Sequence, residues 1–398
     1  MGRTWSFGAV LLTVGFSLLA PEADEAARGA VEVAAAEAGA RDSMAVQAAR
    51  AKLIDEFAKK KYYDTRHFDL SDLPAYLPEQ KITGPIRIWG SDMFGGAELK
   101  RNLQAGFRKY HPKASFELDL RGPAMAFAGL LTERADLGPS RRITWDALLA
   151  FQRLFNHDPL VVSGMTGWAV NPPFAIMVNK NNPLRGLTMK QLDGIFGAER
   201  NGGWMGTAWH PEFARGAADN IRTWGQLGLG GQWQDQPIHV YGYGLRYLFG
   251  PRFSDDVLKG SDKWNEKLKQ YVNFAQADGT LKSADQQMAD ELAKDPYGIA
   301  YYAPLRGVNG QTRAVPLAAA EGGPYVALSM DTVRDRTYPL YDQMYIYINR
   351  RPAEPLNPKV KEFMRYILSR EGQQEIARDT TMLPLTAAEI QVQLAKLD

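Results

Sequence analysis

Hydrophobic residues from Ile82 onward follow two spacings in turn. Ile86 and Ile88 stand two positions apart and predict a short strand that ends at Gly90. In the next segment, hydrophobic residues recur every three or four positions, as in a helix that packs on one side. These residues are Leu99, Leu103, Phe107 and Tyr110. Alternation then returns over residues 116–120. This strand–helix–strand order predicts parallel sheets covered by helices.

The middle and the end of the chain repeat the same order. Residues 174–178 form a continuous apolar run, which is typical of a buried strand. Thr188 and Gln191 match a capping box, so a helix is expected to begin there. Residues 360–368 predict an amphipathic helix. Further strand candidates are residues 238–241, 298–302 and 344–348.

Residues 200–235 interrupt this pattern. They are rich in glycine and tryptophan and predict a long surface excursion. Its four tryptophans are Trp204, Trp209, Trp224 and Trp233. We interpret them as residues that bury the loop, in preference to a platform for sugar rings. The acidic pair Asp255–Asp256, which follows soon after, is expected to be solvated.

The beginning of the chain lies outside the alternating pattern. Residues 7–20 are apolar or small, a length too short for a membrane span and suited to the core of a signal peptide. We therefore expect residues 1–20 to be a signal peptide. Residues 21–81 are expected to comprise a flexible leader, an amphipathic helix and an extended connector. The alternative for the apolar segment is an uncleaved anchor.

Composition narrows the classes of function. The 398 residues suffice for at least two cores. The chain has 47 basic and 45 acidic residues and a formal charge of +2, so nucleic acid is not an expected partner. Cysteine is absent, which excludes disulfides, thiolate metal sites, a cysteine nucleophile and the lipid attachment site of a lipoprotein.

Motifs for catalysis are absent as well. The chain has no G-x-S-x-G, no H-E-x-x-H and no phosphate-binding P-loop. Its five histidines are scattered without the spacing of metal ligands. We therefore expect neither an enzyme nor a metal site nor any cofactor.

Several short motifs follow one another in order between Ile82 and Glu389. They are residues 88–94 (Ile-Trp-Gly-Ser-Asp-Met-Phe), 135–141 (Ala-Asp-Leu-Gly-Pro-Ser-Arg), 178–188, 223–228, 237–242, 298–302, 338–349, 363–372 and 383–386. Taken together, these motifs resemble the phosphate-type (PstS-like) substrate-binding proteins of ABC importers.

The resemblance implies an α/β fold of two doubly wound lobes joined by a two-strand hinge, the type II periplasmic binding protein fold. The first lobe would combine residues 82–175 with residues 335–398, and the second would comprise residues 176–334. A ligand would lie in the cleft between the lobes, at strand ends and helix starts, where backbone N–H groups favour an anion.

Most ligand contacts implied by the resemblance lie in the first lobe. They are Ser91, Asp92, Met93 and Phe94 at the first helix start, Gly122 at the second, and Ser140 and Arg141 in the next loop. Asp92 is alternatively the cap of its helix. Strict phosphate binders carry an aspartate where this chain has Arg141, so an acceptor for the phosphate proton is replaced by a fork of donors. The alternative is that Arg141 and Arg142 form a solvated surface pair.

The second lobe departs further from the family. Tyr243 stands where the family has an arginine, and Arg246 is a neighbouring position that could restore the charge. Two interpretations of Tyr243 stay open. It packs in the core, or it lines a larger pocket for an organic anion.

The sequence thus predicts an exported, periplasmic and monomeric protein that binds phosphate or a related small anion, with an ABC permease as its partner. The alternative is a binding-protein fold recruited as an envelope sensor or interaction protein, with a degraded phosphate pocket.

Overall fold

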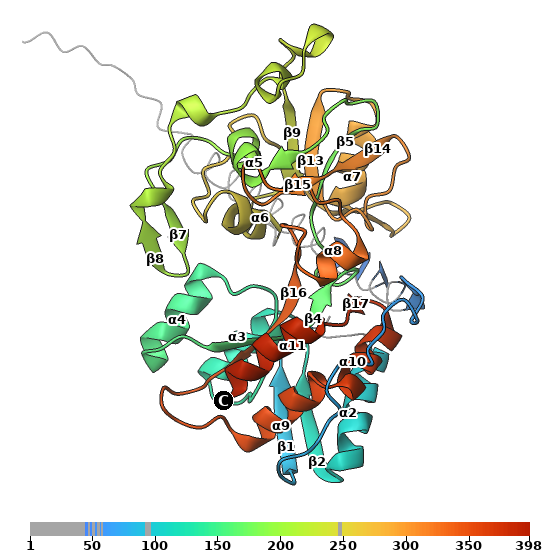
Figure 1. The fold of residues 1–398 in the computed structure, drawn as a ribbon, viewed down its shortest axis with the longest axis vertical. Helices are drawn as coiled ribbons and strands as arrows, with labels where there is room; N and C mark the ends of the chain where they lie inside the picture. The colour runs from blue at the N-terminus through green and yellow to red at the C-terminus, as the bar shows by residue number, and fades with distance from the viewer. Residues whose placement is uncertain are drawn as a thin grey trace, which may run out of the picture.

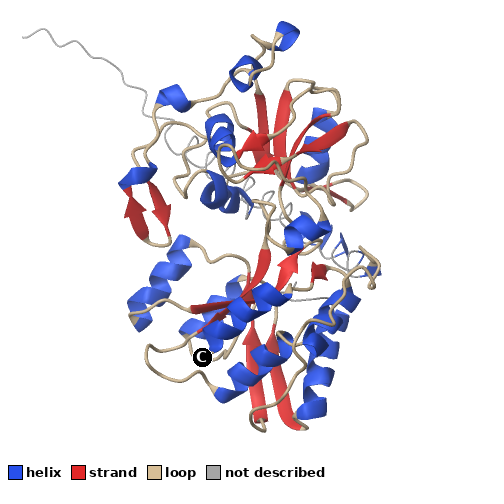
Figure 2. Cartoon of the chain, in the orientation of Figure 1, coloured by secondary structure: helices blue, strands red, loops and turns tan. Residues whose placement is uncertain are grey.

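The computed structural model describes residues 44–46, 48–49, 52–53, 56, 59–91, 97–245 and 249–398. These residues form two lobes, each a β-sheet with helices packed on it (Figure 1 and Figure 2). The predicted α/β fold of two lobes is confirmed.

The first lobe has a two-stranded and a four-stranded sheet, linked by one bridge, and it brings several strand ends to one edge. Its strands are β1 (Thr83–Trp89), β2 (Lys113–Asp119), β3 (Gly138–Ser140), β4 (Leu160–Gly167), β16 (Gln343–Ile348) and β17 (Met382–Leu383). β1 pairs in parallel with β2, and a parallel bridge from Ile88 to Leu137 places it beside β3. β16 runs antiparallel to β3 and β4. The carboxyl ends of β1, β2 and β3 therefore lie at the edge where β16 begins. The helices are α2 (Ala97–Tyr110), α3 (Ala124–Leu131), α4 (Trp145–Phe155), α9 (Pro358–Ile367), α10 (Arg370–Asp379) and α11 (Ala387–Leu394).

The second lobe has a five-stranded sheet in the order β10-β9-β13-β5-β14. These strands are β5 (Ala175–Asn179), β9 (His239–Tyr243), β10 (Lys269–Tyr271), β13 (Gly298–Tyr302) and β14 (Thr312–Val315). Its helices are α5 (Met189–Phe196), α6 (Phe249–Val257), α7 (Ala284–Leu292) and α8 (Met330–Arg334). Short pairs are β6 (Leu187–Thr188) with β15 (Leu317–Ala318), β7 (Gly203–Met205) with β8 (Ala208–His210), and β11 (Phe274–Ala275) with β12 (Leu281–Lys282). Because β9 and β13 are parallel, their carboxyl ends meet at one edge.

The chain passes between the lobes twice, once between β4 and β5 and once between α8 and β16 (Figure 1). The two crossing segments are bonded to each other. The backbone N–H of Phe174 donates to the carbonyl of Leu340 (3.1 Å), and the hydroxyl of Tyr338 donates to the carbonyl of Phe174 (2.9 Å). The two lobes are therefore joined by a double connection.

Local signals in the sequence are reproduced at helix ends. The hydroxyl of Thr188 accepts from the backbone of Gln191, and the Gln191 side chain accepts in return from the backbone of Thr188, which confirms the capping box at α5. Helix α9 confirms the amphipathic pattern near the end of the chain. Among the helices of the described ranges, none has the length and apolar character needed to cross a membrane.

The connector that precedes β1 belongs to the first lobe. Residues 60–82 form neither helix nor strand, but Leu73 and Tyr76 are buried. The hydroxyl of Tyr76 donates to Glu362 Oε2 (2.6 Å) and lies 2.7 Å from His111 Nε2. The predicted signal peptide, the leader and much of the helix that follows lie outside the described residues.

The excursion after α5 is partly buried and partly exposed. Trp224 is fully buried, and Trp233 packs edge-on against it with ring centres 5.9 Å apart. Trp204 and Trp209 are 38% and 44% exposed. The interpretation that the tryptophans bury this segment is therefore confirmed for Trp224 and wrong for Trp204 and Trp209.

Candidate functional site

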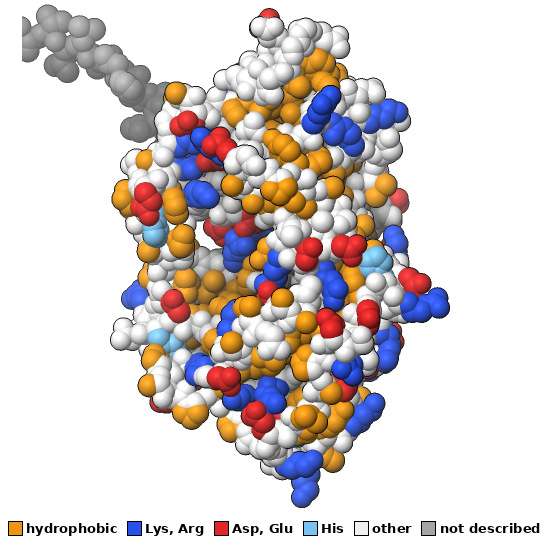
Figure 3. Space-filling model, viewed as in Figure 1, with side chains coloured by type: hydrophobic (Ala, Val, Ile, Leu, Met, Phe, Trp, Pro, Cys, Tyr) orange, Lys and Arg blue, Asp and Glu red, His pale blue; other side chains and the backbone are white. Residues whose placement is uncertain are grey.

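The strand ends of both lobes face the space between them. Figure 3 shows a hollow in the surface between the lobes, with acidic and basic side chains beside it. In a sheet of this kind, ligands bind outside the carboxyl ends of the strands. The candidate site is therefore built from the loops after β1, β2, β3, β9 and β13 and from helix α6.

On the side of the first lobe, backbone bonds hold three loops together. The N–H of Ser91 donates to the carbonyl of Pro139 (2.8 Å), and the N–H of Gly122 donates to the carbonyl of Gly90 (3.1 Å). The hydroxyl of Ser140 donates to the carbonyl of Pro123 (3.1 Å), which leaves its oxygen as an acceptor. The structure thus brings Ser91, Gly122 and Ser140 together at one edge of the sheet.

The start of α3 is open to a ligand. Gly122 has a φ of +155°, and a Cβ added there would meet no atom within 4 Å. Pro123 caps the helix without a side-chain hydrogen bond to its first turn. Pro123 has no N–H, and the N–H groups of Met125 and Ala126 donate to the carbonyls of Gly122 (3.0 Å) and Pro123 (3.2 Å), so the N–H of Ala124 is the donor that a ligand can reach at this start.

Arg141 lies against a residue of the other lobe. Its guanidinium carbon is 5.1 Å from the ring centre of Phe249, the first residue of α6. The backbone of its loop is fixed by Tyr347, whose hydroxyl accepts from the N–H of Ile143 (2.7 Å) and donates to the carbonyl of Arg141 (3.1 Å). The buried Tyr347 therefore positions this loop so that it faces the second lobe.

Arg142 joins the lobes directly. Its guanidinium lies 2.6 Å from Asp256 Oδ1 on α6 and donates to the hydroxyl of Tyr345 (3.4 Å). Burial disfavours its charge, but Asp256, Tyr345 and Asp342 raise the pKa of Arg142 well above its ordinary value. The solvated-pair interpretation is therefore wrong for Arg142, and so is the expectation that Asp256 is solvated.

Arg252, the arginine of α6, ties the helix to both crossing segments. Arg252 donates to the carbonyls of Pro172 (2.8 Å) and Leu340 (3.2 Å), and its guanidinium lies 3.2 Å from Asp342 Oδ2. It also lies over the ring of Phe174, at 4.0 Å. Burial raises the pKa of Asp342, and Arg252 and Arg142 work against that shift. This network fixes α6 to the hinge.

Arg306 is a site residue that sequence reasoning missed. Its guanidinium carbon is 5.7 Å from the ring centre of Phe249, and its Nη2 donates to the carbonyl of Ala169 in the first crossing segment (3.0 Å). Arg141 and Arg306 therefore approach the same ring from opposite lobes. The only signal in the sequence was that Arg306 follows closely after the strand at residues 298–302.

Tyr243 does not reach the cleft. Its side chain is fully buried in the second lobe, where its hydroxyl donates to Asp285 Oδ1 (2.6 Å) and accepts from the N–H of Ala303 (3.1 Å). Burial raises the pKa of Tyr243 well above its ordinary value, and Asp285 adds to the shift. The expectation that Tyr243 contacts a ligand is therefore wrong, and the packing interpretation accounts for the residue. Asp92, Met93, Phe94 and Arg246 lie outside the described residues.

Two further acidic groups complete the surroundings. Burial raises the pKa of Asp285, and Arg306 works against that shift. Asp255 is exposed, as the sequence predicts, but partial burial of its carboxyl still raises its pKa to about 6; Arg142 opposes this, and Asp256 and Asp262 add to it. The site therefore holds arginines beside carboxylates whose negative charge is disfavoured by their surroundings.

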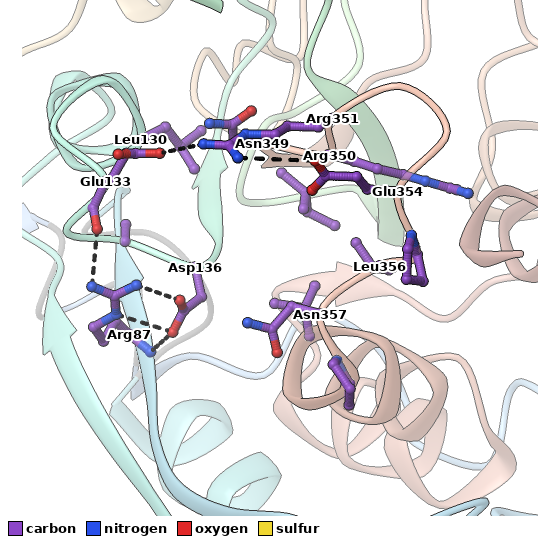
Figure 4. Close-up of a pocket in the computed structure, with 15 residues that line it drawn as sticks. Arg87, Leu130, Glu133, Asp136, Asn349, Arg350, Arg351, Glu354, Leu356 and Asn357 are labelled. Carbon is purple, nitrogen blue, oxygen red and sulfur yellow. Dashed lines mark hydrogen bonds and ion pairs between the residues drawn. The ribbon is translucent and has the colours of Figure 1, made fainter.

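A separate cavity of about 400 Å³ lies in the first lobe, beyond the far end of β16 (Figure 4). Four of its charged residues pair with one another, and Arg350 donates to the carbonyls of Lys396 and Asp398. Arg87 lies 2.6 Å from Asp136, and Arg351 lies 3.6 Å from Glu133. Because these charges are matched within the wall, the cavity has no evident ligand, and the inter-lobe site remains the candidate.

Comparison with known proteins gives a family and relatives. Residues 169–371 match the model of the PBP superfamily domain. The chain is 28% identical over 320 residues to the phosphate-binding protein PstS of Pseudomonas aeruginosa, which covers 80% of this chain and 88% of that protein.

Two solved structures are among those that match the chain. An ABC-type phosphate transport receptor from Vibrio cholerae matches with a TM-score of 0.46 and 17% identity, over 75% of this chain and all of that one. PstS from Borrelia burgdorferi matches with a TM-score of 0.48 and 12% identity, over 77% of this chain and all of that one.

Proposed function

Because the chain belongs to the PBP superfamily, we propose that it is a solute-binding protein that captures phosphate or a related small anion between its lobes for an ABC importer. The observation that carries the proposal is the approach of Arg141 and Arg306, from opposite lobes, to the ring of Phe249 at the start of α6.

The chemistry of these groups suits an oxyanion. A guanidinium presents a planar fork of donors that matches the oxygens of phosphate or sulfate. The hydroxyl of Ser91 and the N–H of Ala124 at the start of α3 lie on the same edge as Arg141 and add neutral donors. An anion bound by both arginines would be held by both lobes, so binding would favour the closed form.

The ligand class is drawn from the relative as well as from the site. The similar protein of Pseudomonas aeruginosa is named for binding phosphate. In this chain, Arg141 stands where the resemblance would place an acceptor for the phosphate proton. We therefore propose that the site does not discriminate between oxyanions that carry a proton and those that do not, so that phosphate and sulfate compete for it.

Export and partner follow from the same proposal. Residues 1–20 would direct the protein to the periplasm, where it would act as a monomer and deliver its ligand to an ABC permease. We propose no catalytic activity. The part of the chain that the structure describes contains no group of three His, Cys, Asp or Glu side chains that could hold a metal ion.

Calorimetry with phosphate, sulfate and a small organic phosphate tests the proposal. The variants Arg141→Ala and Arg306→Ala each remove charged hydrogen bonds, so we expect the Kd to rise about 10- to 100-fold. Arg351→Ala is the matched control, because its guanidinium pairs with Glu133 on the far side of the first lobe. If the intact protein bound none of these anions at millimolar concentration, or if both variants bound as tightly as the control, the proposal would fail.

A further inference from the structure

A β-hairpin of the second lobe reaches toward the first. Strands β7 and β8 pair with Trp204 opposite Trp209 and turn through Gly206 and Thr207. Gly206 has a φ of +58°, a conformation that glycine adopts without a steric penalty. In Figure 1 the tip of this hairpin points at helix α4, on the side of the molecule away from the crossing segments. The hairpin thus spans the space between the lobes.

The hairpin contacts one face of α4. Trp204 packs edge-on against Trp145, with ring centres 5.8 Å apart, and the hydroxyl of Thr207 donates to Gln152 Oε1 (2.9 Å). Leu148 Cδ2 lies 3.5 Å from the place of a Cβ on Gly206. Residues 145, 148 and 152 are three and four positions apart, so they share one side of the helix. The contact is therefore a fitted one, formed along successive turns of α4.

The root of the hairpin is attached to helix α6. The N–H of Trp204 donates to the carbonyl of Lys259 (2.7 Å), just beyond the end of α6. A Cβ on Gly203 would lie 2.4 Å from that same carbonyl oxygen, so only glycine permits this close approach. Because the start of α6 carries Phe249, the hairpin and the candidate anion site lie at opposite ends of one helix.

Contacts between the lobes form a row along these two elements. Near the hinge, Arg141 lies against Phe249 and Arg142 pairs with Asp256. Farther out, Trp145 meets Trp204 and Gln152 meets Thr207. All first-lobe members come from residues 141–152, and all second-lobe members come from α6 or the hairpin rooted on it. The hairpin is therefore the outermost member of a single closing surface.

The outer contacts differ from the inner ones in strength. Trp145 and Trp204 remain 47% and 38% exposed, and an edge-on ring pair or a neutral hydrogen bond is a modest interaction. The inner contact between Arg142 and Asp256 joins two charges at 2.6 Å. Contacts of modest strength at the rim can form and break as the lobes move.

We propose that the β7–β8 hairpin is a latch across the mouth of the cleft, which holds the lobes closed through Trp204 and Thr207 and sets how long a bound anion is retained. The role of the latch in retention rests on the proposed function. Its effect on lobe closure does not, because the contacts to α4 join the two lobes directly.

Lobe closure can be measured in the ligand-free protein. The chain has no cysteine, so Arg153→Cys on α4 and Asp235→Cys on the second lobe can carry a pair of spin labels without background. Adding Trp145→Ala and Thr207→Ala removes one partner from each rim contact. We expect the distance distribution to broaden and shift to longer values. Leu154→Ala on α4 and Met205→Ala on the hairpin are exposed apolar controls and should leave it unchanged.

Ligand retention is measured with inorganic phosphate by stopped flow. Trp145→Ala with Thr207→Ala should release phosphate about tenfold faster than the control pair, because two modest contacts are lost from the closed form. Unchanged label distances together with an unchanged release rate would overturn the latch. If the intact protein binds neither phosphate nor sulfate nor the small organic phosphate, the proposed function fails, and the label distances alone decide for or against the latch. If the double variant folds poorly, the milder Thr207→Val replaces it. This variant should also lengthen the label distance and speed phosphate release, to a smaller extent.

Discussion

The two faces of the cleft are built in different ways. On the first lobe, the loops after β1, β2 and β3 hold one another through backbone bonds, such as that from Ser91 to Pro139. On the second lobe, α6 is held by side chains that reach away from it, above all Arg252 with its bonds to the crossing segments. The first face is shaped by its backbone, and the second is shaped by charged side chains.

This difference indicates where substitutions should act. A face shaped by backbone bonds keeps its form when a side chain such as Arg141 is removed, so the main loss should be in ligand affinity. A face shaped by buried charges loses stability first, because removing one charge leaves its partner buried without compensation. Arg306 combines both roles, since it approaches Phe249 and also donates to the crossing segment at Ala169.

The largest expected effect is at Arg252. Its side chain is 7% exposed, and Arg252→Met would leave Asp342 buried beside fewer compensating charges. We expect a loss of about 3–5 kcal/mol in the free energy of unfolding, measured by urea titration with tryptophan fluorescence. Arg142→Met on the opposite face is the comparison. Its side chain is 33% exposed, so we expect about 1 kcal/mol. Equal losses in the two variants would contradict the distinction between the faces.

The fold was largely predictable because its signals are local. Spacing of hydrophobic residues gives strands and helices, and their order predicts helices packed on sheets. The expectation of parallel sheets is wrong in part, because β16 runs antiparallel to β3 and β4, and β5 runs antiparallel to β13 and β14. The capping box at Thr188 and the amphipathic helix α9 were predicted for the same reason. Packing of the connector was not, because Leu73 and Tyr76 lie in a stretch without periodicity and meet partners far along the chain, such as Glu362.

The site was predictable only where it follows a strand end closely. Ser91, Gly122, Ser140 and Arg141 do so, and the structure brings them to one edge. Arg306 was missed because nothing in its local sequence indicates that it turns back toward Phe249. The pairing of Arg142 with Asp256 was missed because it depends on how the two lobes face each other, which no local pattern records.

Tyr243 offers an intermediate effect on the second face. Tyr243→Phe removes the hydroxyl that donates to Asp285 and accepts from Ala303, and leaves both partners buried. We expect the free energy of unfolding to fall by about 1–3 kcal/mol and the Kd for phosphate to stay within about twofold of the intact protein. Tyr302→Phe is the control, since its hydroxyl has only a 3.4 Å contact to Thr312 and should matter less. A large loss of affinity with unchanged stability would restore Tyr243 as a ligand contact.

The smallest expected effect is a pH dependence at Asp255, on the outer part of α6. The pKa of this carboxyl is raised from 3.8 to about 6, chiefly by burial. Between these two values the folded protein holds a proton that the unfolded chain has released, so stability falls as pH rises from about 4 to 6. Asp255→Asn removes this loss. Because part of Asp255 is exposed and screened by solvent, we expect a gain of no more than about 1 kcal/mol at pH 7.5 and none near pH 4.

Asp278 in the β11–β12 hairpin gives a control of opposite sign. Its pKa is lowered by hydrogen bonds from Thr280, so its contribution is present at neutral pH and is lost as pH falls. Urea titrations at several pH values should therefore show that, relative to the intact protein, the stability of Asp255→Asn increases as pH rises. The relative stability of Asp278→Asn should decrease over the same range. If the free energy of unfolding of Asp255→Asn matched that of the intact protein at every pH, ionisation of Asp255 would cost the folded protein no stability. The charges that shape the second face would then be Arg252 with Asp342 and Asp256 with Arg142, without a contribution from Asp255.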